Sequence, residues 1–445
     1  MKEKSTSASP FLIIIYHFLK VIVKISFPVF YSKIVVSNKE RAKFKNPCII
    51  VSNHPSTMMD PLNAVAWVSS EVYFLANASL FKTPFQNWFF NTFYCFPVER
   101  YQDTGGKPLQ NEDSFKKSEA FLSGGGCLYI APEGTSFVER HLRKMKTGTA
   151  RIALNTERKN NFELGLTILP VGLNYSDATA FRSPIFVNFG EPIKVAAFQE
   201  IWQSDAKEAV RQLTGRMGNA LSELIIDTEK KEEDRFIQKL EIVLQNEFPL
   251  NLPVHFRRTK GLIENLRQWE KTNAETFFSF KEKMDYYFQK LNELEITDAV
   301  LKKRGASVFQ LLSLFLGFPL FSYGFATNFL PCYVPGQINR HFNDDESYDA
   351  TFKYLAGLVA FPLFYGLQTS LFFWLFRSGW MALLFVLSLI PAGLFGEWYL
   401  KQTRLVFQNW RLKNQFKHDP KLIENLSETR KSIIQKLSTC LPQCL

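Results

Sequence analysis

The chain has 445 residues and a net charge of +11, from 53 Lys and Arg against 42 Asp and Glu. This length allows two or three structural units, and the positive charge favours an anionic partner such as a lipid surface, a phosphorylated substrate or nucleic acid. The 44 Phe residues crowd into apolar runs, which favours lipid over nucleic acid, and the six scattered cysteines have no metal-ligand spacing and argue against a disulfide framework.

The N-terminal segment 1–36 predicts a helix at a membrane. After a polar stretch, residues 11–25 are strongly apolar, but His17, Lys20 and Lys24 recur at helical spacing. This stripe is typical of a helix that lies in the membrane interface, and the apolar run is short for a full span. No small-residue cleavage site follows the run, which argues against a signal peptide.

Residues 37–196 alternate between strand-like and helix-like patterns. Apolar runs rich in β-branched residues predict strands at Cys48–Val51, Val72–Leu75, Phe93–Val98, Cys127–Ile130, Thr167–Leu173 and Ile185–Phe189. Helical patterns lie between them, at about Pro61–Val68, Ser114–Leu122 and Gly148–Thr156. The alternation predicts an α/β domain with a mainly parallel sheet flanked by helices, and no nucleotide-binding fingerprint is present.

The remaining sequence changes character twice. Residues 197–303 predict a charged helical extension, interrupted near the two prolines of 248–253. Region 304–400 then predicts two or three transmembrane helices, from the uncharged runs Val308–Val334, Leu355–Phe376 and Gly379–Gly396. Residues 401–445 form a basic tail.

The charges that flank these apolar runs predict a topology. Lys302, Lys303 and Arg304 precede the first run, whereas the loop 343–346 after it is acidic. The positive-inside tendency therefore predicts an integral membrane protein whose α/β domain and tail are cytoplasmic, at the inner membrane in a bacterium, with the acidic loop on the opposite side. Three complete spans would leave the tail on the wrong side, so one run is expected to be re-entrant, and the last run, which contains Pro391, is the first candidate.

A candidate site follows the first buried strand. Pro55 disfavours the α region for His54, so the imidazole is expected in an extended turn before a helix. Asp60 comes six positions later, in about the second helical turn, where a carboxylate can orient a histidine that acts as a general base. The alternative is that His54 only caps the helix and Asp60 faces solvent.

Three later segments also end strand-like runs: Phe96–Arg100, Ile130–Ser136 and Leu169–Tyr175. The carboxyl ends of parallel strands gather at one edge of a sheet, where ligands bind. We therefore expect His54, Arg100 and Glu133 to lie along that edge.

In this order the four segments resemble the motifs of the membrane-bound glycerolipid acyltransferases, which include glycerol-3-phosphate and lysophosphatidate acyltransferases. The resemblance covers about residues 45–195. The stretch from His54 to Asp60 is similar to the histidine–aspartate motif of the family. The other blocks look like its phosphate-binding, Pro-Glu-Gly and closing proline motifs, at Phe96–Arg100, Pro132–Ser136 and Leu169–Leu173.

Two departures narrow this resemblance. Five residues separate His54 from Asp60 where the common pattern has four, and the longer spacing is similar to the branch of fungal glycerol-3-phosphate and dihydroxyacetone-phosphate acyltransferases. The stretch Ala350–Lys353 and the late membrane region resemble the same branch. Ser136 stands where many lysophosphatidate enzymes carry an arginine, which leaves Arg100 as the main expected phosphate ligand.

The resemblance implies transfer of an acyl group from an acyl thioester, acyl-CoA or acyl carrier protein, to a hydroxyl of glycerol 3-phosphate, with lysophosphatidate as the alternative acceptor. It implies His54 and Asp60 as catalytic residues and a substrate-binding set of Arg100, Glu133, Gly134, Thr135, Ser136 and Pro170. Membrane lipids are expected partners, and no cofactor, metal or nucleic acid is expected. Arg100 could instead pair with Glu99 or another surface carboxylate, and Pro170 could be architectural. A membrane scaffold or transporter and an inactive relative are the non-enzymatic alternatives.

Overall fold

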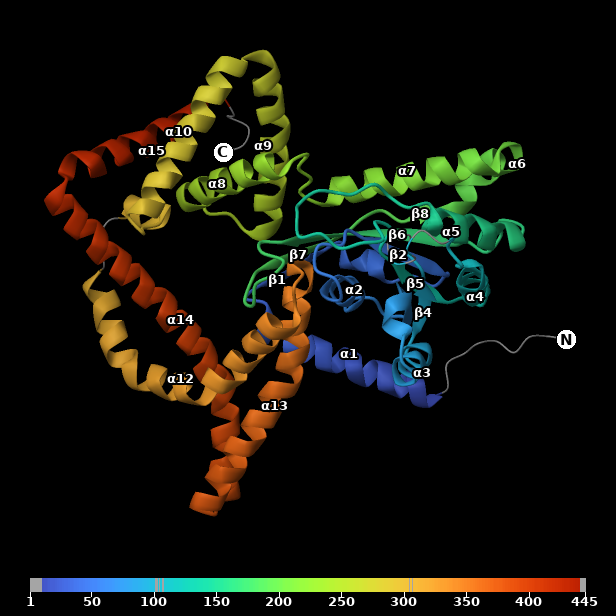
Figure 1. The fold of residues 1–445 in the computed structure, drawn as a ribbon, viewed down its shortest axis with the longest axis horizontal. Helices are drawn as coiled ribbons and strands as arrows, with labels where there is room; N and C mark the ends of the chain where they lie inside the picture. Colours follow the sequence, from blue (N-terminus) through green and yellow to red (C-terminus); the bar gives the residue numbers. More distant parts are fainter. Residues whose placement is uncertain are drawn as a thin grey trace. The chain divides into compact units, whose positions relative to one another are not determined.

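The computed structural model describes residues 10–100, 103, 105, 108–303, 305 and 307–440, without the side chains of Asn91 and Cys440. The polar N-terminal residues, Arg304 of the basic flank and Cys444 lie outside this part of the chain. The chain divides into two compact units. The first comprises Met1–Asp227 together with Asn343–Thr351, and the second Thr228–Phe342 together with Phe352–Leu445 (Figure 1).

The first unit is built on one eight-stranded sheet with the order β1-β7-β6-β2-β5-β3-β4, and β8 pairs with β6. The strands are β1 (Ile34–Ser37), β2 (Cys48–Ser52), β3 (Val72–Asn77), β4 (Cys95–Val98), β5 (Cys127–Ile130), β6 (Thr167–Tyr175), β7 (Ile185–Phe189) and β8 (Ile193–Lys194). The five strands from β6 to β4 run parallel, whereas β7 and β8 are antiparallel to β6. The mainly parallel sheet predicted from the sequence is confirmed, and the short strands β1 and β8 were not predicted.

Seven α-helices belong to the described part of the first unit. They are α1 (Pro10–Phe30), α2 (Met59–Val65), α3 (Pro84–Thr92), α4 (Glu112–Ser123), α5 (Gly148–Lys159), α6 (Gln199–Ser204) and α7 (Ala206–Leu224). Helix α7 packs on β6, so closely that a Cβ on Gly172 would lie 2.2 Å from the carbonyl oxygen of Leu224. The compact unit therefore continues to Asp227, beyond residue 196, where the charged extension was expected to begin.

The two faces of the central strands point to different surroundings, because side chains alternate along a strand. Ile49, Val51 and Leu128 belong to the large apolar core that they share with α4, α5 and α7. On the opposite face the Ser52 hydroxyl lies 2.8 Å from the Tyr129 hydroxyl. The apolar face thus holds the sheet to its helices, and the other face carries buried polar groups beneath the candidate site.

Two residues of the polar stripe of helix α1 contact the α/β unit, whereas Lys24 of the same stripe is exposed. The Lys20 ammonium donates to the carbonyl of Val68, and His17 Nε2 lies 3.0 Å from the Glu71 carboxylate. The outward face carries Phe11, Ile14, Phe18, Val21 and Ile25, each more than half exposed. Part of the stripe that predicted a helix in the membrane interface therefore contacts protein, and the apolar side of the helix is left exposed.

The second unit is helical. Its helices are α8 (Lys231–Glu247), α9 (Leu252–Thr272), α10 (Ala274–Glu293), α11 (Asp298–Lys303), α12 (Val308–Phe342), α13 (Asp349–Phe376), α14 (Gly379–His418) and α15 (Pro420–Cys440). Helix α14 continues from the third apolar run into the basic tail, and α15 packs against α10 and α14. The tail is therefore helical where the structure describes it.

Four helices in the described part of the chain are long and apolar enough to cross a membrane. They are Pro10–Phe30, Val308–Phe342, Glu346–Phe376 and Gly379–His418. The first was expected to be too short for a span, but its 21 residues give it the required length.

The acidic loop does not lie where the charge pattern predicted. Residues 343–351 belong to the same compact unit as the α/β sheet, and Thr351 hydrogen-bonds Thr57 directly. A membrane cannot separate two groups that touch, so the prediction that this loop lies across the membrane from the α/β domain is wrong.

Candidate active site

The candidate site centres on a histidine held by a buried carboxylate. His54 follows β2, and its Nδ1 lies 2.9 Å from Asp60 Oδ2 in the first turn of α2, one turn earlier than predicted. An ionised carboxylate only accepts hydrogen bonds, so Nδ1 carries the proton and Nε2 presents a lone pair. Nε2 has no hydrogen-bond partner among the described residues, and the His54 side chain is 18% exposed. The geometry is that of an oriented base open on one side.

Asp60 is fully buried, and each of its oxygens is satisfied. Oδ1 accepts from the Tyr175 hydroxyl at 2.7 Å, and Oδ2 accepts from the backbone N–H of Ser56 at 2.7 Å in addition to His54. Burial, followed by the charge of Asp60, raises the pKa of Tyr175 well above its usual range, so the phenol remains a donor. The alternative in which Asp60 faces solvent is therefore wrong.

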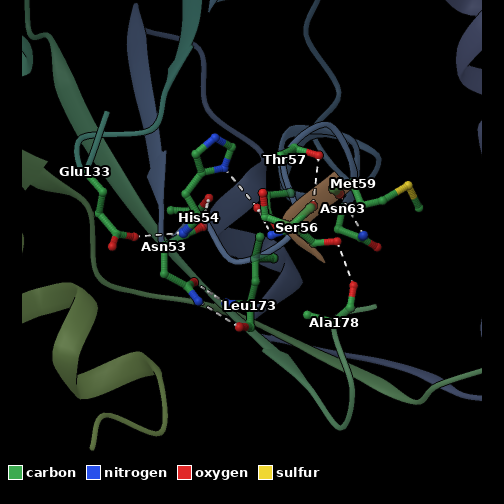
Figure 2. Close-up of polar contacts among 12 residues, drawn as sticks. Asn53, His54, Ser56, Thr57, Met59, Asn63, Glu133, Leu173 and Ala178 are labelled. Atoms are coloured by element: carbon green, nitrogen blue, oxygen red, sulfur yellow. Dashed lines mark hydrogen bonds and ion pairs between the residues drawn. The ribbon is translucent and has the colours of Figure 1, made fainter. Parts of the chain in front are cut away.

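Glu133 binds the backbone of this site. It follows β5, the parallel neighbour of β2, and its Oε1 accepts from the His54 backbone N–H at 2.8 Å while Oε2 accepts from the Arg143 N–H at 3.0 Å. Figure 2 shows Glu133 reaching the His54 backbone, opposite the turn of Ser56 and Thr57. Burial raises the pKa of Glu133, and these backbone donors oppose the rise. Glu133 thus fixes the position of His54, whereas the sequence predicted a contact with substrate.

The turn after Glu133 closes over the same histidine. Gly134 has a φ of +75°, a conformation that glycine adopts without steric cost, and its N–H bonds the carbonyl of Ala131. Thr135 and Ser136 follow, both half-buried. The Phe137 N–H then donates to the His54 carbonyl at 3.2 Å. Residues 134–136, which were predicted to bind substrate, therefore lie between the two residues that hydrogen-bond the His54 backbone, Glu133 and Phe137.

Two predicted substrate-binding residues lie elsewhere. Arg100 follows β4, three strands from β2, which is about 14 Å at ordinary strand spacing. Its guanidinium makes a bidentate pair with Asp103, at 2.6 and 3.2 Å, as the alternative of a surface carboxylate anticipated. Pro170 is buried inside β6 in register with Val51, and its carbonyl accepts from Gly190. Its place is architectural.

A strongly basic segment leaves the same turn. Residues 140–146 contain Arg140, His141, Arg143, Lys144 and Lys146. The Lys146 N–H donates to the carbonyl of Pro132, and the Arg143 N–H to Glu133, so this segment is fixed to the strand beside β2. The Arg143 guanidinium lies over the Phe137 ring at 4.3 Å and pairs with the Glu139 carboxylate, whereas its buried Nε has no partner among the described residues.

Several residues of the site were not predicted. The Asn53 side chain exchanges two hydrogen bonds with the backbone of Leu173, at 2.8 and 2.9 Å, and so extends the pairing of β2 with β6 (Figure 2). Tyr175 and Asn63 meet beside Asp60. Tyr175 is the last residue of the segment Leu169–Tyr175, which the sequence already places at a strand end. Because strand ends were expected to meet at the site, Tyr175 could have been predicted as a neighbour of Asp60.

Known proteins resemble the part of the chain that contains these residues. Residues 33–174 match the Acyltransferase family model. Glycerol-3-phosphate O-acyltransferase 2 of Saccharomyces cerevisiae is 30% identical over 114 residues, which cover 25% of this chain and 15% of that protein. Glycerol-3-phosphate O-acyltransferase 1 of the same yeast is 28% identical over 138 residues, which cover 30% and 18%. The chain therefore spans less than a fifth of the length of these two relatives.

Two further proteins, one compared by sequence and one by structure, also resemble part of this chain. The chloroplastic 1-acyl-sn-glycerol-3-phosphate acyltransferase of Brassica napus is 23% identical over 159 residues, covering 36% of this chain and 42% of that protein. The crystal structure of the 1-acyl-sn-glycerophosphate acyltransferase PlsC from Thermotoga maritima superposes with a TM-score of 0.34 and 20% identity, over 50% of this chain and 83% of that one. Residues 33–174 thus match the Acyltransferase family model, and over part of its length the chain resembles the fungal glycerol-3-phosphate O-acyltransferases.

Proposed function

We propose that this protein transfers a fatty acyl group from an acyl thioester to a hydroxyl of glycerol 3-phosphate. The observation that carries the proposal is the His54–Asp60 pair, in which Nδ1 is held by a buried carboxylate and Nε2 is open. A hydroxyl is a weak nucleophile at neutral pH, so its attack on a thioester needs a general base. The yeast relatives are named for this acceptor, which supports the choice.

The reaction needs no group beyond the substrates. His54 Nε2 takes the proton as the acceptor oxygen attacks the thioester carbonyl, and Asp60 stabilises the imidazolium that forms. The tetrahedral intermediate then breaks its carbon–sulfur bond, and the leaving thiolate takes the proton back from Nε2. The donor is acyl-CoA or an acylated carrier protein, and no acyl-enzyme intermediate is required.

Two sets of basic residues compete for the acceptor phosphate. Arg100 has the planar guanidinium that suits a phosphate, but it is paired with Asp103 and follows a strand at the edge of the sheet. The segment 140–146 follows the strand next to β2, and Arg143 pairs with Glu139 but keeps a buried Nε without a partner among the described residues. We therefore assign the phosphate first to Arg143 and second to Arg100.

The proposed setting is the cytoplasmic surface of a membrane, the inner membrane in a bacterial cell. The apolar outer face of α1 and the net positive charge both favour anionic lipid. The acyl chains of donor and product are poorly soluble in water, so a site near the bilayer limits the distance they travel.

The test is acyl transfer by membranes that contain the protein, with labelled glycerol 3-phosphate and lysophosphatidate offered separately beside a long-chain acyl thioester. We expect product from glycerol 3-phosphate, and a loss of about 10²- to 10⁴-fold for His54→Ala. His418→Ala, an exposed histidine at the end of α14, is the matched control. Product from lysophosphatidate alone would move the protein to that acceptor, and equal rates for wild type and His54→Ala would overturn the mechanism.

The same assay separates the two arginines. A lost charge-assisted hydrogen bond should raise the acceptor KM about tenfold in Arg143→Ala, with a smaller rise in Arg100→Ala. Arg216→Ala, exposed on α7, serves as control. A larger rise for Arg100→Ala would return the phosphate to the residue first predicted from the sequence.

A further inference from the structure

The turn after His54 is held by a segment almost three hundred residues later in the chain. Thr57 Oγ1 lies 2.6 Å from Thr351 Oγ1 and donates to the Ser347 carbonyl at 3.2 Å. All three residues are buried, at 7%, 6% and 3% exposure. Because Thr57 donates its one proton to Ser347, Thr351 is the donor in the short contact with Thr57, and the Ser56 carbonyl at 3.5 Å is a second, longer acceptor of the Thr351 hydroxyl. The contact lies within the first compact unit.

The later segment is itself well ordered by local hydrogen bonds. Asn343 Nδ2 donates to Asp349 Oδ1 at 2.9 Å, and the Asp345 carboxylate accepts from the Ser347 N–H at 2.9 Å. Thr351 stands in the first turn of α13, directly after this turn. The segment 343–351 therefore presents Thr351 and the Ser347 carbonyl in a fixed arrangement.

Thr57 needs such support, because its backbone has a φ of +39°. A β-branched residue rarely adopts the left-handed region, and such conformations persist where surrounding contacts hold them. Two hydrogen bonds to the hydroxyl of Thr57 supply that hold. The strain lies three residues after His54 and three before Asp60, inside the segment that joins the pair.

The strained turn is coupled to the histidine through one oxygen. The Ser56 N–H donates to Asp60 Oδ2 at 2.7 Å, and the same oxygen accepts from His54 Nδ1. On its other side Ser56 Oγ donates to the Ala178 carbonyl at 2.8 Å (Figure 2). A shift of the Ser56–Thr57 turn would therefore move a donor of Asp60 and change how Asp60 holds the imidazole.

We propose that Thr351 is a positioning residue for the general base: through Thr57 it holds the turn that sets the geometry of His54 and Asp60. This inference rests on the proposed acyl transfer. It makes the active site of the α/β unit depend on the start of α13, which lies outside the residues that match the family model.

The test compares Thr351→Val, which keeps the shape and removes the hydroxyl, with wild type in the acyl-transfer assay. We expect kcat to fall about fivefold to tenfold, in proportion to one hydrogen bond, with the KM of both substrates unchanged. Thr351→Ser restores the hydroxyl and should restore kcat. The matched control is Thr369→Val on the same helix, whose hydroxyl has no partner among the described residues, and it should leave kcat unchanged.

A double substitution tests whether Thr351 acts through Thr57. Thr57→Val removes the same hydrogen bond and the one to Ser347, which leaves Thr351 only its long contact with the Ser56 carbonyl at 3.5 Å. Thr57→Val with Thr351→Val should therefore be little slower than Thr57→Val alone. The proposal would be overturned if the two substitutions lowered kcat by independent factors that multiply. It would also be overturned if Thr351→Val kept the wild-type kcat, or if its loss of kcat came with a matching fall in melting temperature. If the wild-type protein transfers acyl groups and Thr351→Val is equally active, only this inference is rejected. If the wild-type protein transfers no acyl group, the proposed function is rejected as well.

Discussion

Each compact unit contains an aspartate whose side chain is fully buried. The two aspartates have similar hydrogen-bond donors, and they differ in the charged or titratable side chain that each one faces. Asp60 and Asp298 both accept a hydrogen bond from a tyrosine, Tyr175 at 2.7 Å and Tyr287 at 2.6 Å. Asp298 also accepts from Asn246 at 2.8 Å. Buried carboxylates need such donors because an unpaired charge away from water is costly. By burial and tyrosine contact alone the two sites could not be told apart.

The third partner separates them. Arg430 donates to both oxygens of Asp298, at 2.8 and 3.2 Å, and is itself only 8% exposed, so a permanent charge pair is sealed between α11 and α15. Asp60 faces His54, whose ring is partly exposed. A buried carboxylate opposite arginine holds helices together. Opposite an accessible histidine it can support proton transfer.

The sharpest way to break this comparison is the same substitution at both positions. Asp60→Asn should reduce acyl transfer by about 10²- to 10⁴-fold, because an amide no longer fixes the tautomer of His54. Asp298→Asn should leave the rate per folded molecule unchanged but destabilise the helical unit by about 3 kcal/mol, because Arg430 keeps a buried charge without its main partner. Transfer rates and thermal unfolding of each unit measure the two effects.

The control for that experiment is Asp285→Asn, which removes an exposed pair with Lys239. Exposed ion pairs contribute at most about 1 kcal/mol, so little change is expected. If Asp298→Asn lowered the acyl-transfer rate about 10²- to 10⁴-fold, or if Asp60→Asn did not lower it, the assignment of a catalytic role to Asp60 and a structural role to Asp298 would be contradicted.

The tyrosines sharpen the comparison at a smaller scale. Tyr175→Phe removes the donor to Asp60 Oδ1 and should lower kcat about tenfold, since a hydrogen bond to a charged group contributes about 1.5–3 kcal/mol. Tyr287→Phe removes the equivalent donor to Asp298 and should lower the stability of the helical unit by a similar free energy, with kcat unchanged. Kinetics and thermal unfolding of both variants check this, and identical responses would remove the distinction.

The smallest predicted effect is a difference in the pH dependence of stability. Burial raises the pKa of Glu133 above 4.5, so its stabilising contribution is present below pH 4.5 and is lost as the pH rises through the folded-state pKa. Arg430 lowers the pKa of Glu247 below 4.5, so that contribution is present above pH 4.5 and is lost as the pH falls through the folded-state pKa.

The glutamine variants should therefore differ from wild type with opposite slopes. The stability advantage of wild type over Glu133→Gln should shrink as the pH rises, and its advantage over Glu247→Gln should shrink as the pH falls. Limited proteolysis of each unit against temperature, from pH 4 to pH 7, measures both trends. Parallel slopes would show that the two carboxylates share one environment.

Local patterns predicted much of the α/β unit. The bounds of β5 and β7 agree with the prediction, because each is a short buried run with clear turn signals at its ends. Helix α3 was missed although its start carries a capping box, with the Thr83 hydroxyl accepting from the Gln86 N–H. That signal was available in the sequence. The position of His54 next to Asp60 followed from spacing and the order of motifs.

The remaining features depend on contacts that no local pattern contains. Arg100 finds Asp103 through the path of a loop, and Glu133 turns to backbone donors that have no side-chain signature. The hydrogen bond from Thr351 to Thr57 joins residues 294 positions apart. The polar stripe of α1 had the correct helical period, but periodicity cannot reveal whether a polar face meets water or protein.

The contact between Thr351 and Thr57 also links the candidate site to the start of an apolar helix. Thr351 lies in the first turn of α13, and the apolar stretch of this candidate membrane span follows directly in the sequence. Through Thr57 the same residue touches the turn that joins His54 to Asp60. Any displacement of the start of α13 would therefore act directly on the turn between the base and its carboxylate.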